Sequence, residues 1–155
     1  MKPILKYIDQ MWIVGIGVRT TNYAESRTDT AKIPALWKRF FQEKIGDKIP
    51  NQIRDSQTYG VYSSYESDHN GKYTLMAGKC VSNADRLPRE FTVVNIEAGD
   101  YLVFEGRGHI PNVVIDLWKE IWDYFSSEQT PKRKYTTDFE LYRSDGAVAI
   151  HIAVA

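Results

Sequence analysis

The sequence predicts an α+β fold in which two duplicated strand-helix-strand-strand units join into one antiparallel sheet. Three observations predict it. Alternating apolar stretches of strand length recur along the chain. Two amphipathic stretches of helix length separate them, and the order of elements in the second half repeats that of the first. At 155 residues the chain is one domain long, so we expect a single domain over residues 1–155.

The first half begins after a mixed lead-in, residues 1–10, for which no element is predicted. In residues 12–20 larger apolar side chains alternate mostly with small ones, which is the spacing of a strand. Gly15 and Gly17 leave one face of this strand nearly bare. Either something lies close over that face or the strand bends there. The polar residues 21–30 have no periodicity and are predicted to form a loop.

A helix is predicted next, because apolar residues fall at helical spacing over residues 33–45 and Gly46 is suited to end it. Two strands, residues 58–65 and 72–81, complete the first half. The polar turn between them contains Asn70-Gly71, which favours the positive φ angles of a hairpin.

The second half follows the polar residues 83–90 and has the same plan. Its helix is amphipathic, and the basic Lys132-Arg133-Lys134 that comes after it is interpreted as solvated surface. Gly106-Arg107-Gly108 is interpreted as flexible backbone that leads into the helix. The predicted elements are strands at 91–96 and 101–105, a helix at 113–125, a strand leading from 135 through 138–142, and a closing strand at 148–154.

The repeat also extends to particular residues of the two halves, residues 10–82 and 90–155. Each helix begins Ile-Pro and carries Leu-Trp-Lys. In each half, a tyrosine of a predicted strand follows this tryptophan at nearly the same distance along the chain. A pseudo-twofold arrangement follows, with both helices on one side of the sheet and a cleft between the halves. The repeat matches Trp37 with Trp118, Tyr62 with Tyr142, and Gly60 with Glu140.

Composition excludes several classes of function. The chain has 20 basic and 20 acidic residues, so it lacks the broad basic field that draws a protein to nucleic acid. The single Cys80 cannot form an internal disulfide, and no signal segment or membrane-spanning run is apparent. We therefore expect a cytoplasmic protein without direct nucleic-acid or membrane binding. With 10 Tyr, 6 Phe and 4 Trp, it has ample surface for stacking on planar or cationic ligands.

Residues 138–142 place Glu140 inside an apolar, aromatic strand. Burying an uncompensated charge is costly, so either this carboxylate points to water or something cationic meets it. We favour the second interpretation. Glu140 and Tyr142 share one face of the strand, while Phe139 and Leu141 share the other. The sequence leaves open which of these faces meets the helices.

Four motifs give the chain a resemblance to a known family: Lys32–Trp37, Tyr59–Tyr62 followed by Tyr65–Asp68, Leu117–Trp122, and Asp138–Tyr142. Together they resemble the GyrI-like small-molecule-binding domains, which are effector-binding modules of AraC- and MerR-type multidrug-sensing regulators and also occur as separate proteins. The resemblance runs from Trp12 to Val154. No helix-turn-helix segment flanks it, so we expect a free-standing binder.

The resemblance implies that Glu140 lies at the bottom of an aromatic pocket and pairs with small lipophilic cations. Broad selectivity and affinities on the order of micromolar are expected, because stacking surfaces tolerate many planar cations. No cofactor, metal or catalytic residue is expected. The ligand-binding residues we expect are Glu140, Trp37, Phe41, Tyr62, Trp118 and Tyr142.

Two other functions occur in the same family and stay open. One is hydrolysis of reactive natural products, for which Glu140 and a tyrosine such as Tyr142 would act as general base and acid. The other is a protein interaction, such as inhibition of DNA gyrase. The natural ligand, a protein partner and the oligomeric state are not predicted.

Overall fold

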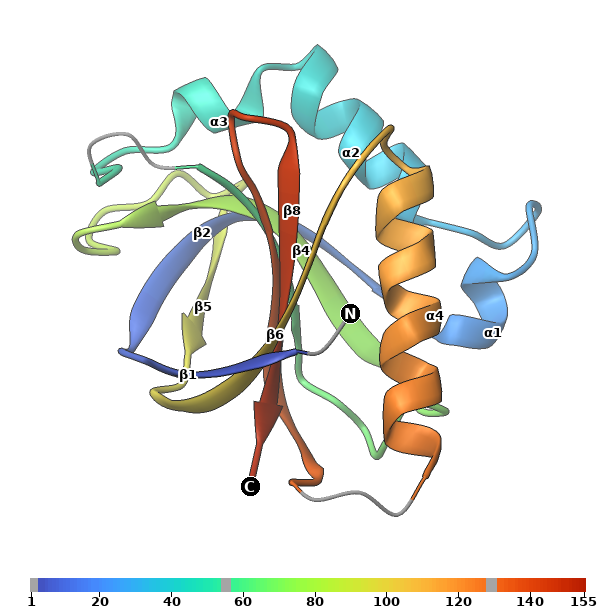
Figure 1. Ribbon diagram of the computed structural model, residues 1–155. Coiled ribbons are helices and arrows are strands. Elements are labelled where there is room, and N and C mark those ends of the chain that lie inside the picture. The colour runs from blue at the N-terminus through green and yellow to red at the C-terminus, as the bar shows by residue number, and fades with distance from the viewer. Residues whose placement is uncertain (1–2, 54–56, 128–130) are drawn as a thin grey trace.

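The computed structural model describes residues 3–53, 57–127 and 131–155. It confirms the predicted α+β class: in the described residues, helices accompany an eight-stranded antiparallel sheet (Figure 1). The strands are β1 (Ile4–Ile8), β2 (Met11–Thr20), β3 (Thr58–Ser63), β4 (Tyr73–Val81), β5 (Thr92–Ile96), β6 (Gly99–Arg107), β7 (Arg133–Tyr142) and β8 (Ala147–Val154). The helices are α1 (Asn22–Glu25), α2 (Ile33–Gln42), α3 (Ile45–Lys48) and α4 (Asn112–Ser126).

The strand order shows the duplication. It reads β1-β6-β8-β7-β3-β4-β2-β5 and is symmetric about the central pair of β7 and β3. Each half contributes one strand more than the repeat predicts, because β1 precedes β2 and β5 precedes β6. These extra strands are exchanged: β1 pairs with β6 of the second half and β5 pairs with β2 of the first. The two halves therefore build one continuous sheet.

Two predictions for the first 30 residues are wrong: that residues 1–10 form no element, and that residues 21–30 form a loop. Within residues 3–10 lies β1, an edge strand whose side chains are mostly exposed. It carries no one-sided apolar pattern, so periodicity does not reveal it. Residues 21–30, predicted to form a loop, contain the single turn of α1. Its start is capped by Thr21 Oγ1, which accepts a hydrogen bond from the Ala24 backbone N–H at 3.0 Å.

Some boundaries also differ from the predictions. The helix predicted over residues 33–45 ends at Gln42, and the short helix α3 follows it. Lys44 lies between the two helices with a left-handed φ of 52°, a conformation that an α-helix cannot continue. Gly106-Arg107, predicted to be flexible, extend β6 because they pair with the start of β8. The sequence of a single strand does not show where its partner ends.

The surroundings of Gly15 decide between the two alternatives for the first predicted strand, a close neighbour over its bare face or a bend. It lies opposite Gly78 in the β2–β4 ladder. A Cβ on Gly15 would overlap the backbone carbonyl oxygen of Ala77. The neighbouring strand therefore approaches closely at this point, and glycine is required because it has no side chain.

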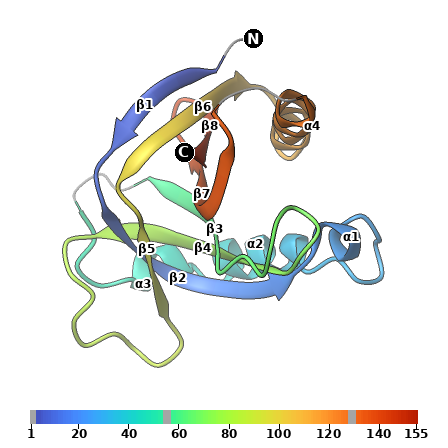
Figure 2. The ribbon, with the colours of Figure 1, turned by 90° about the horizontal axis from the view of Figure 1, so that it is seen from below.

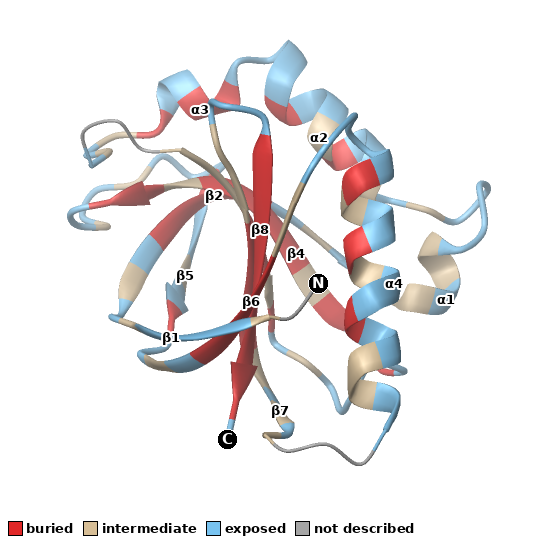
Figure 3. Ribbon diagram, viewed as in Figure 1, coloured by how far each residue is buried: buried red, intermediate tan, exposed pale blue. Residues whose placement is uncertain are grey.

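Apolar clusters lie on both faces of the sheet. On one face α2 packs against β2 and β4 through Leu36, and α4 packs against β6 and β8 through Ile121. The opposite face carries a third cluster that includes Val61 and Phe139 of the central strands. Strand β8 is buried along its whole length (Figure 3). None of the helices in the described part of the chain is long and apolar enough to span a bilayer.

The two helices cover different parts of the same face. Figure 2 shows the sheet strongly bent, with α4 beside β6 and α2 beside β2 and β4. Between the helices the central strands β3 and β7 are left without a covering helix. This gap in the helix layer is where the predicted site residues meet.

Candidate functional site

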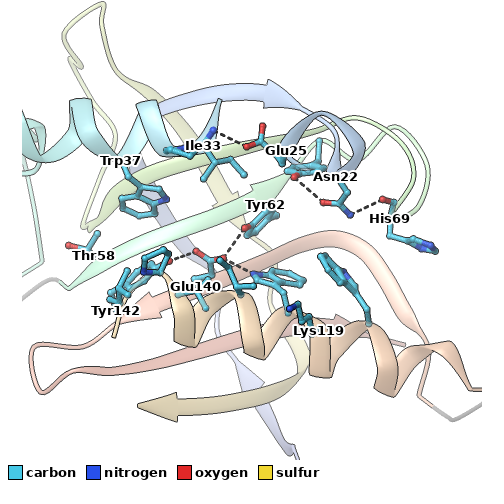
Figure 4. A pocket seen from close by; sticks show the side chains of 18 of the residues that line it. Asn22, Glu25, Ile33, Trp37, Thr58, Tyr62, His69, Lys119, Glu140 and Tyr142 are labelled. Atoms are coloured by element: carbon cyan, nitrogen blue, oxygen red, sulfur yellow. Dashed lines mark hydrogen bonds between the residues drawn. The ribbon is translucent and has the colours of Figure 1, made fainter. Parts of the chain in front are cut away.

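A cavity of about 1280 Å³ lies between α2 and α4, over the central strands β3 and β7. Figure 4 shows Trp37 entering it from α2, Lys119 lying on the α4 side, and Glu140 and Tyr62 between them. This volume exceeds the usual range for a site that holds one drug-sized molecule. The structure brings all six predicted residues together on this cavity: Trp37, Phe41, Tyr62, Trp118, Glu140 and Tyr142.

Glu140 faces the helices, which decides the question that the sequence left open. It pairs across the β3–β7 ladder with Gly60, its match in the repeat. A Cβ on Gly60 would lie 2.8 Å from Glu140 Oε1 and 3.1 Å from Trp37 Cζ2. The absence of a side chain at Gly60 therefore makes the space in which the carboxylate lies.

The carboxylate of Glu140 is only 2% exposed and accepts three hydrogen bonds. Tyr142 Oη donates to Oε1 at 2.6 Å, and Tyr62 Oη donates to Oε2 at 2.8 Å. Trp118 Nε1 also donates to Oε2, at 2.7 Å. Among the described residues no lysine or arginine forms an ion pair with it. A buried acid is thus held by neutral donors and lacks a counter-charge.

Burial and hydrogen bonding act in opposite directions on this group. Burial raises the pKa of Glu140 above its usual value, and the three hydrogen bonds oppose the rise. The pKa values of Tyr62 and Tyr142 are both raised well above 10, first by burial and then by the neighbouring carboxylate. Both hydroxyls therefore remain protonated donors at neutral pH, as does the Trp118 indole, which can only donate.

The aromatic walls follow the pseudo-twofold symmetry. The Trp37 ring lies edge-on to Tyr142, with centroids 5.3 Å apart, and the Trp118 ring lies edge-on to Tyr62 at 5.0 Å. Each tryptophan thus contacts the tyrosine of the other half, and both tyrosines contact the same carboxylate. Phe41 stacks on Trp37 and is 62% exposed, so it lies towards the solvent.

Gly60→Ala is expected to distort the site more than the fold. The new methyl group would be forced against both the Glu140 carboxylate and the Trp37 ring. Overpacking of this kind costs about 1–3 kcal/mol. We expect a loss of stability in that range by urea denaturation, together with weaker ligand binding. Unchanged stability and binding would show that the contact between Gly60 and Glu140 is looser than the structure indicates.

A second acid on the same strand face was not among the predicted site residues. Asp138 is fully buried and accepts hydrogen bonds from Tyr65 Oη at 2.5 Å and from the Ala153 backbone N–H at 2.8 Å. Its ion-pair partner is Arg133, at 2.8 Å. The spacing of Asp138 and Glu140, two residues apart on one strand, is the sequence signal that could have indicated a second buried acid.

The interpretation of residues 132–134 as solvated surface is wrong for Arg133. This side chain is 6% exposed, whereas its neighbours on both sides are exposed. The pairing of β7 with β8 is irregular between Arg133 and Asp138: its register shifts there, and the two side chains meet. Such a shift depends on pairing with another strand, so the local sequence gives no sign of it.

Glu25 also lines the cavity but has a structural role. Its carboxylate accepts hydrogen bonds from the backbone N–H groups of Lys32 and Ile33 at 2.9 and 3.0 Å, at the start of α2. It therefore supplies the cap that Lys32 does not provide. In the described part of the chain, no group of three His, Cys, Asp or Glu side chains could hold a metal ion.

The chain is similar to several known proteins. A family model described as "Cass2: Integron-associated effector binding protein" matches residues 4–154. Over 145 residues the chain is 32% identical to YobU of Bacillus subtilis (strain 168), whose name describes it as a candidate transcriptional regulator; the match covers 93% of this chain and 88% of YobU.

Two solved structures are also similar to this chain. The integron cassette protein VCH_CASS2, from the mobile metagenome of Vibrio cholerae, is 38% identical, with a TM-score of 0.85 and coverage of 99% of this chain and 96% of that one. SAV2435, solved bound to tetraphenylphosphonium, is 22% identical, with a TM-score of 0.81 and coverage of 100% and 94%. Because SAV2435 is only 22% identical to this chain, its similarity shows a shared fold alone.

Proposed function

The chain belongs to the Cass2 family of GyrI-like, integron-associated effector-binding proteins, and from this premise we propose that its effectors are lipophilic aromatic cations bound against Glu140. One observation carries the proposal. A carboxylate that is almost fully buried in an aromatic cavity accepts three hydrogen bonds from neutral donors and forms no ion pair in the described part of the chain. A positively charged guest supplies the missing counter-charge.

The energetics favour such a guest over a neutral one. A lipophilic cation gains free energy when its rings leave water but loses the hydration of its charge. The Glu140 carboxylate offsets that loss by Coulomb attraction in a low-dielectric site. Each aromatic face adds roughly 0.5–2 kcal/mol through cation–π contact. A neutral aromatic ligand gains free energy only because its rings leave water, and it leaves the carboxylate without a counter-charge.

The protein already contains one pair of the proposed kind. The Arg133 guanidinium, a flat cation, lies 4.4 Å from the centroid of the Tyr135 ring and pairs with the buried Asp138. Glu140, two residues further along the strand than Asp138, is also a buried acid beside aromatic rings, but no cation of the described residues pairs with it. The tetraphenylphosphonium bound by SAV2435, which shares the fold, is a cation of the class that would complete this second pair.

Hydrolysis by Glu140 and a tyrosine is the weaker candidate, although the two groups are in contact. Tyr142 Oη lies 2.6 Å from the carboxylate, which is the arrangement that such a mechanism needs. A tyrosine whose pKa lies well above 10 is, however, a poor general acid at neutral pH. The carboxylate already accepts three hydrogen bonds from the protein, so its oxygens are occupied by donors other than a substrate or an attacking water. The geometry therefore suits binding better than turnover.

Binding of a quaternary cation, which has no proton to lose, is expected to weaken at acid pH. The ligand binds the ionised form of Glu140, and burial raises the pKa of this carboxyl. Affinity should therefore be full above that raised pKa and fall as the pH drops through it. A titration with a quaternary fluorescent dye between pH 4 and 8 measures this, with circular dichroism to check that the protein stays folded. A flat profile in folded protein would contradict the role of the charge.

A thermal-shift screen tests the proposed function. Aromatic compounds of similar size that are cationic, neutral or anionic are compared at equal concentration. At a hundred times its Kd a ligand stabilises the folded state by about 2.7 kcal/mol, which corresponds to a rise in Tm of roughly 5–11 °C for a chain of this size. Stabilisation confined to the cations supports the proposal. Stabilisation by neutral or anionic compounds to the same degree would overturn it.

A further inference from the structure

Arg133 carries a buried donor that no described residue uses. Its side chain lines the cavity and is 6% exposed, and Nη2 donates to Asp138 Oδ2 at 2.8 Å. The Nε–H group is buried and has no acceptor among the residues that the structure describes. An unsatisfied buried donor costs about 1–3 kcal/mol. Such groups are rare in native proteins, and an unseen ligand or water is one of the usual reasons for them.

The fold holds this guanidinium in one place. The irregular part of β7 between Arg133 and Asp138 contains Tyr135, which has a left-handed φ of 56°. The Tyr135 ring then lies 4.4 Å from Arg133 Cζ, and the ion pair with Asp138 fixes the other side. A stacked and paired guanidinium cannot easily turn its Nε–H towards water elsewhere. An acceptor must come to it.

The free donor lies close to the carboxylate of the proposed cation site. Asp138, which holds Arg133, is two residues from Glu140 on the same strand face, a separation of roughly 7 Å. Trp118 contacts both places: its Nε1 donates to Glu140 at 2.7 Å, and its ring centroid lies 6.0 Å from Arg133 Cζ. Arg133 and Glu140 also line the same cavity, so one ligand in it can contact both.

We propose that the cavity has a second polar subsite at Arg133, which binds an uncharged oxygen acceptor of the same ligand whose cation lies at Glu140. The acceptor is a carbonyl, ester or ether oxygen, because Asp138 already balances the charge of the guanidinium. The inference rests on the proposed function and narrows it. The effectors are lipophilic cations that also carry an uncharged oxygen acceptor, which lies at Arg133 when the charge lies at Glu140.

Two probes and one variant test this subsite. The probes are hexyltriphenylphosphonium and 5-oxohexyltriphenylphosphonium, which differ by one ketone. Arg133→Lys keeps a cation beside Asp138 but has no Nε. By titration calorimetry, wild type should bind the ketone about tenfold more tightly, equivalent to 1.4 kcal/mol. The variant should bind the ketone no more tightly than the alkyl probe, because the oxygen then leaves water without gaining this hydrogen bond. The same ratio of affinities in both proteins would overturn the subsite.

The outcomes separate this inference from the function on which it rests. If wild type binds neither probe, the proposed function fails, and the subsite fails with it. If wild type binds both probes equally, only the subsite fails. Should Arg133→Lys not fold, infrared spectroscopy of the ketone bound to wild type decides. A carbonyl stretch shifted to lower wavenumber than in an apolar solvent supports the hydrogen bond, and an unshifted stretch, as expected if water occupies the donor, overturns it.

Discussion

Replacement of Glu140 by glutamine is expected to weaken the binding of a cationic aromatic dye at least tenfold, a loss of at least 1.4 kcal/mol. The amide has nearly the same shape but no charge. It can accept hydrogen bonds from Tyr62 and Trp118 at one atom and donate to Tyr142 from the other, because a tyrosine hydroxyl can reverse its role. The variant therefore removes the counter-charge and little else. Fluorescence titration measures the effect.

The stability of this variant is its control. A neutral group at position 140 removes the cost of burying a charge, so the urea midpoint should equal or exceed that of wild type. A neutral aromatic ligand should bind the variant and wild type with similar affinity. If the dye binds Glu140→Gln as tightly as wild type, the charge of Glu140 has no part in recognition.

The opposite pattern is expected for Asp138→Asn. Asp138 is fully buried and pairs with Arg133, which is itself almost fully buried. Removal of one partner from such a pair leaves an uncompensated charge and costs about 3–5 kcal/mol. For a chain of this size that corresponds to a fall in Tm of roughly 6–20 °C. Differential scanning calorimetry measures it directly.

The double variant Arg133→Met with Asp138→Asn is the matched control for this prediction. It removes both charges, so it should be more stable than Asp138→Asn alone. A single variant as stable as wild type would show that the buried pair contributes nothing. The two acids of one strand face are thus expected to differ in kind: Asp138 stabilises the fold, and Glu140 binds the ligand.

Much of the fold could be predicted from the sequence because the elements that build the core carry one-sided apolar patterns. The amphipathic helices and the central strands are found close to their predicted positions. The elements that the sequence does not reveal are β1, an exposed edge strand, and the two single turns α1 and α3. β1 is held by its pairing with β6, and α1 by hydrogen bonds of Asn22 with His69 and Tyr73, all of which lie far away in the sequence.

The same reasoning applies to the site. The repeat matched Gly60 with Glu140, and the structure pairs these two residues across the central strands. The place of Arg133 could not be predicted, because it depends on a register shift in the pairing of β7 with β8. Nor does the sequence show that Trp118 donates to the carboxylate, since this contact depends on how α4 packs on the sheet.

The measurement that tests the account most directly compares tetraphenylphosphonium with tetraphenylborate, two ions of nearly the same shape and opposite charge. Titration calorimetry of each into the wild-type protein isolates the contribution of charge, because the burial of the phenyl rings is nearly equal. The cation should bind at least a hundredfold more tightly, a difference of at least 2.7 kcal/mol, about 1.4 kcal/mol for each factor of ten. Equal affinities, or tighter binding of the anion, would contradict a cation site at Glu140.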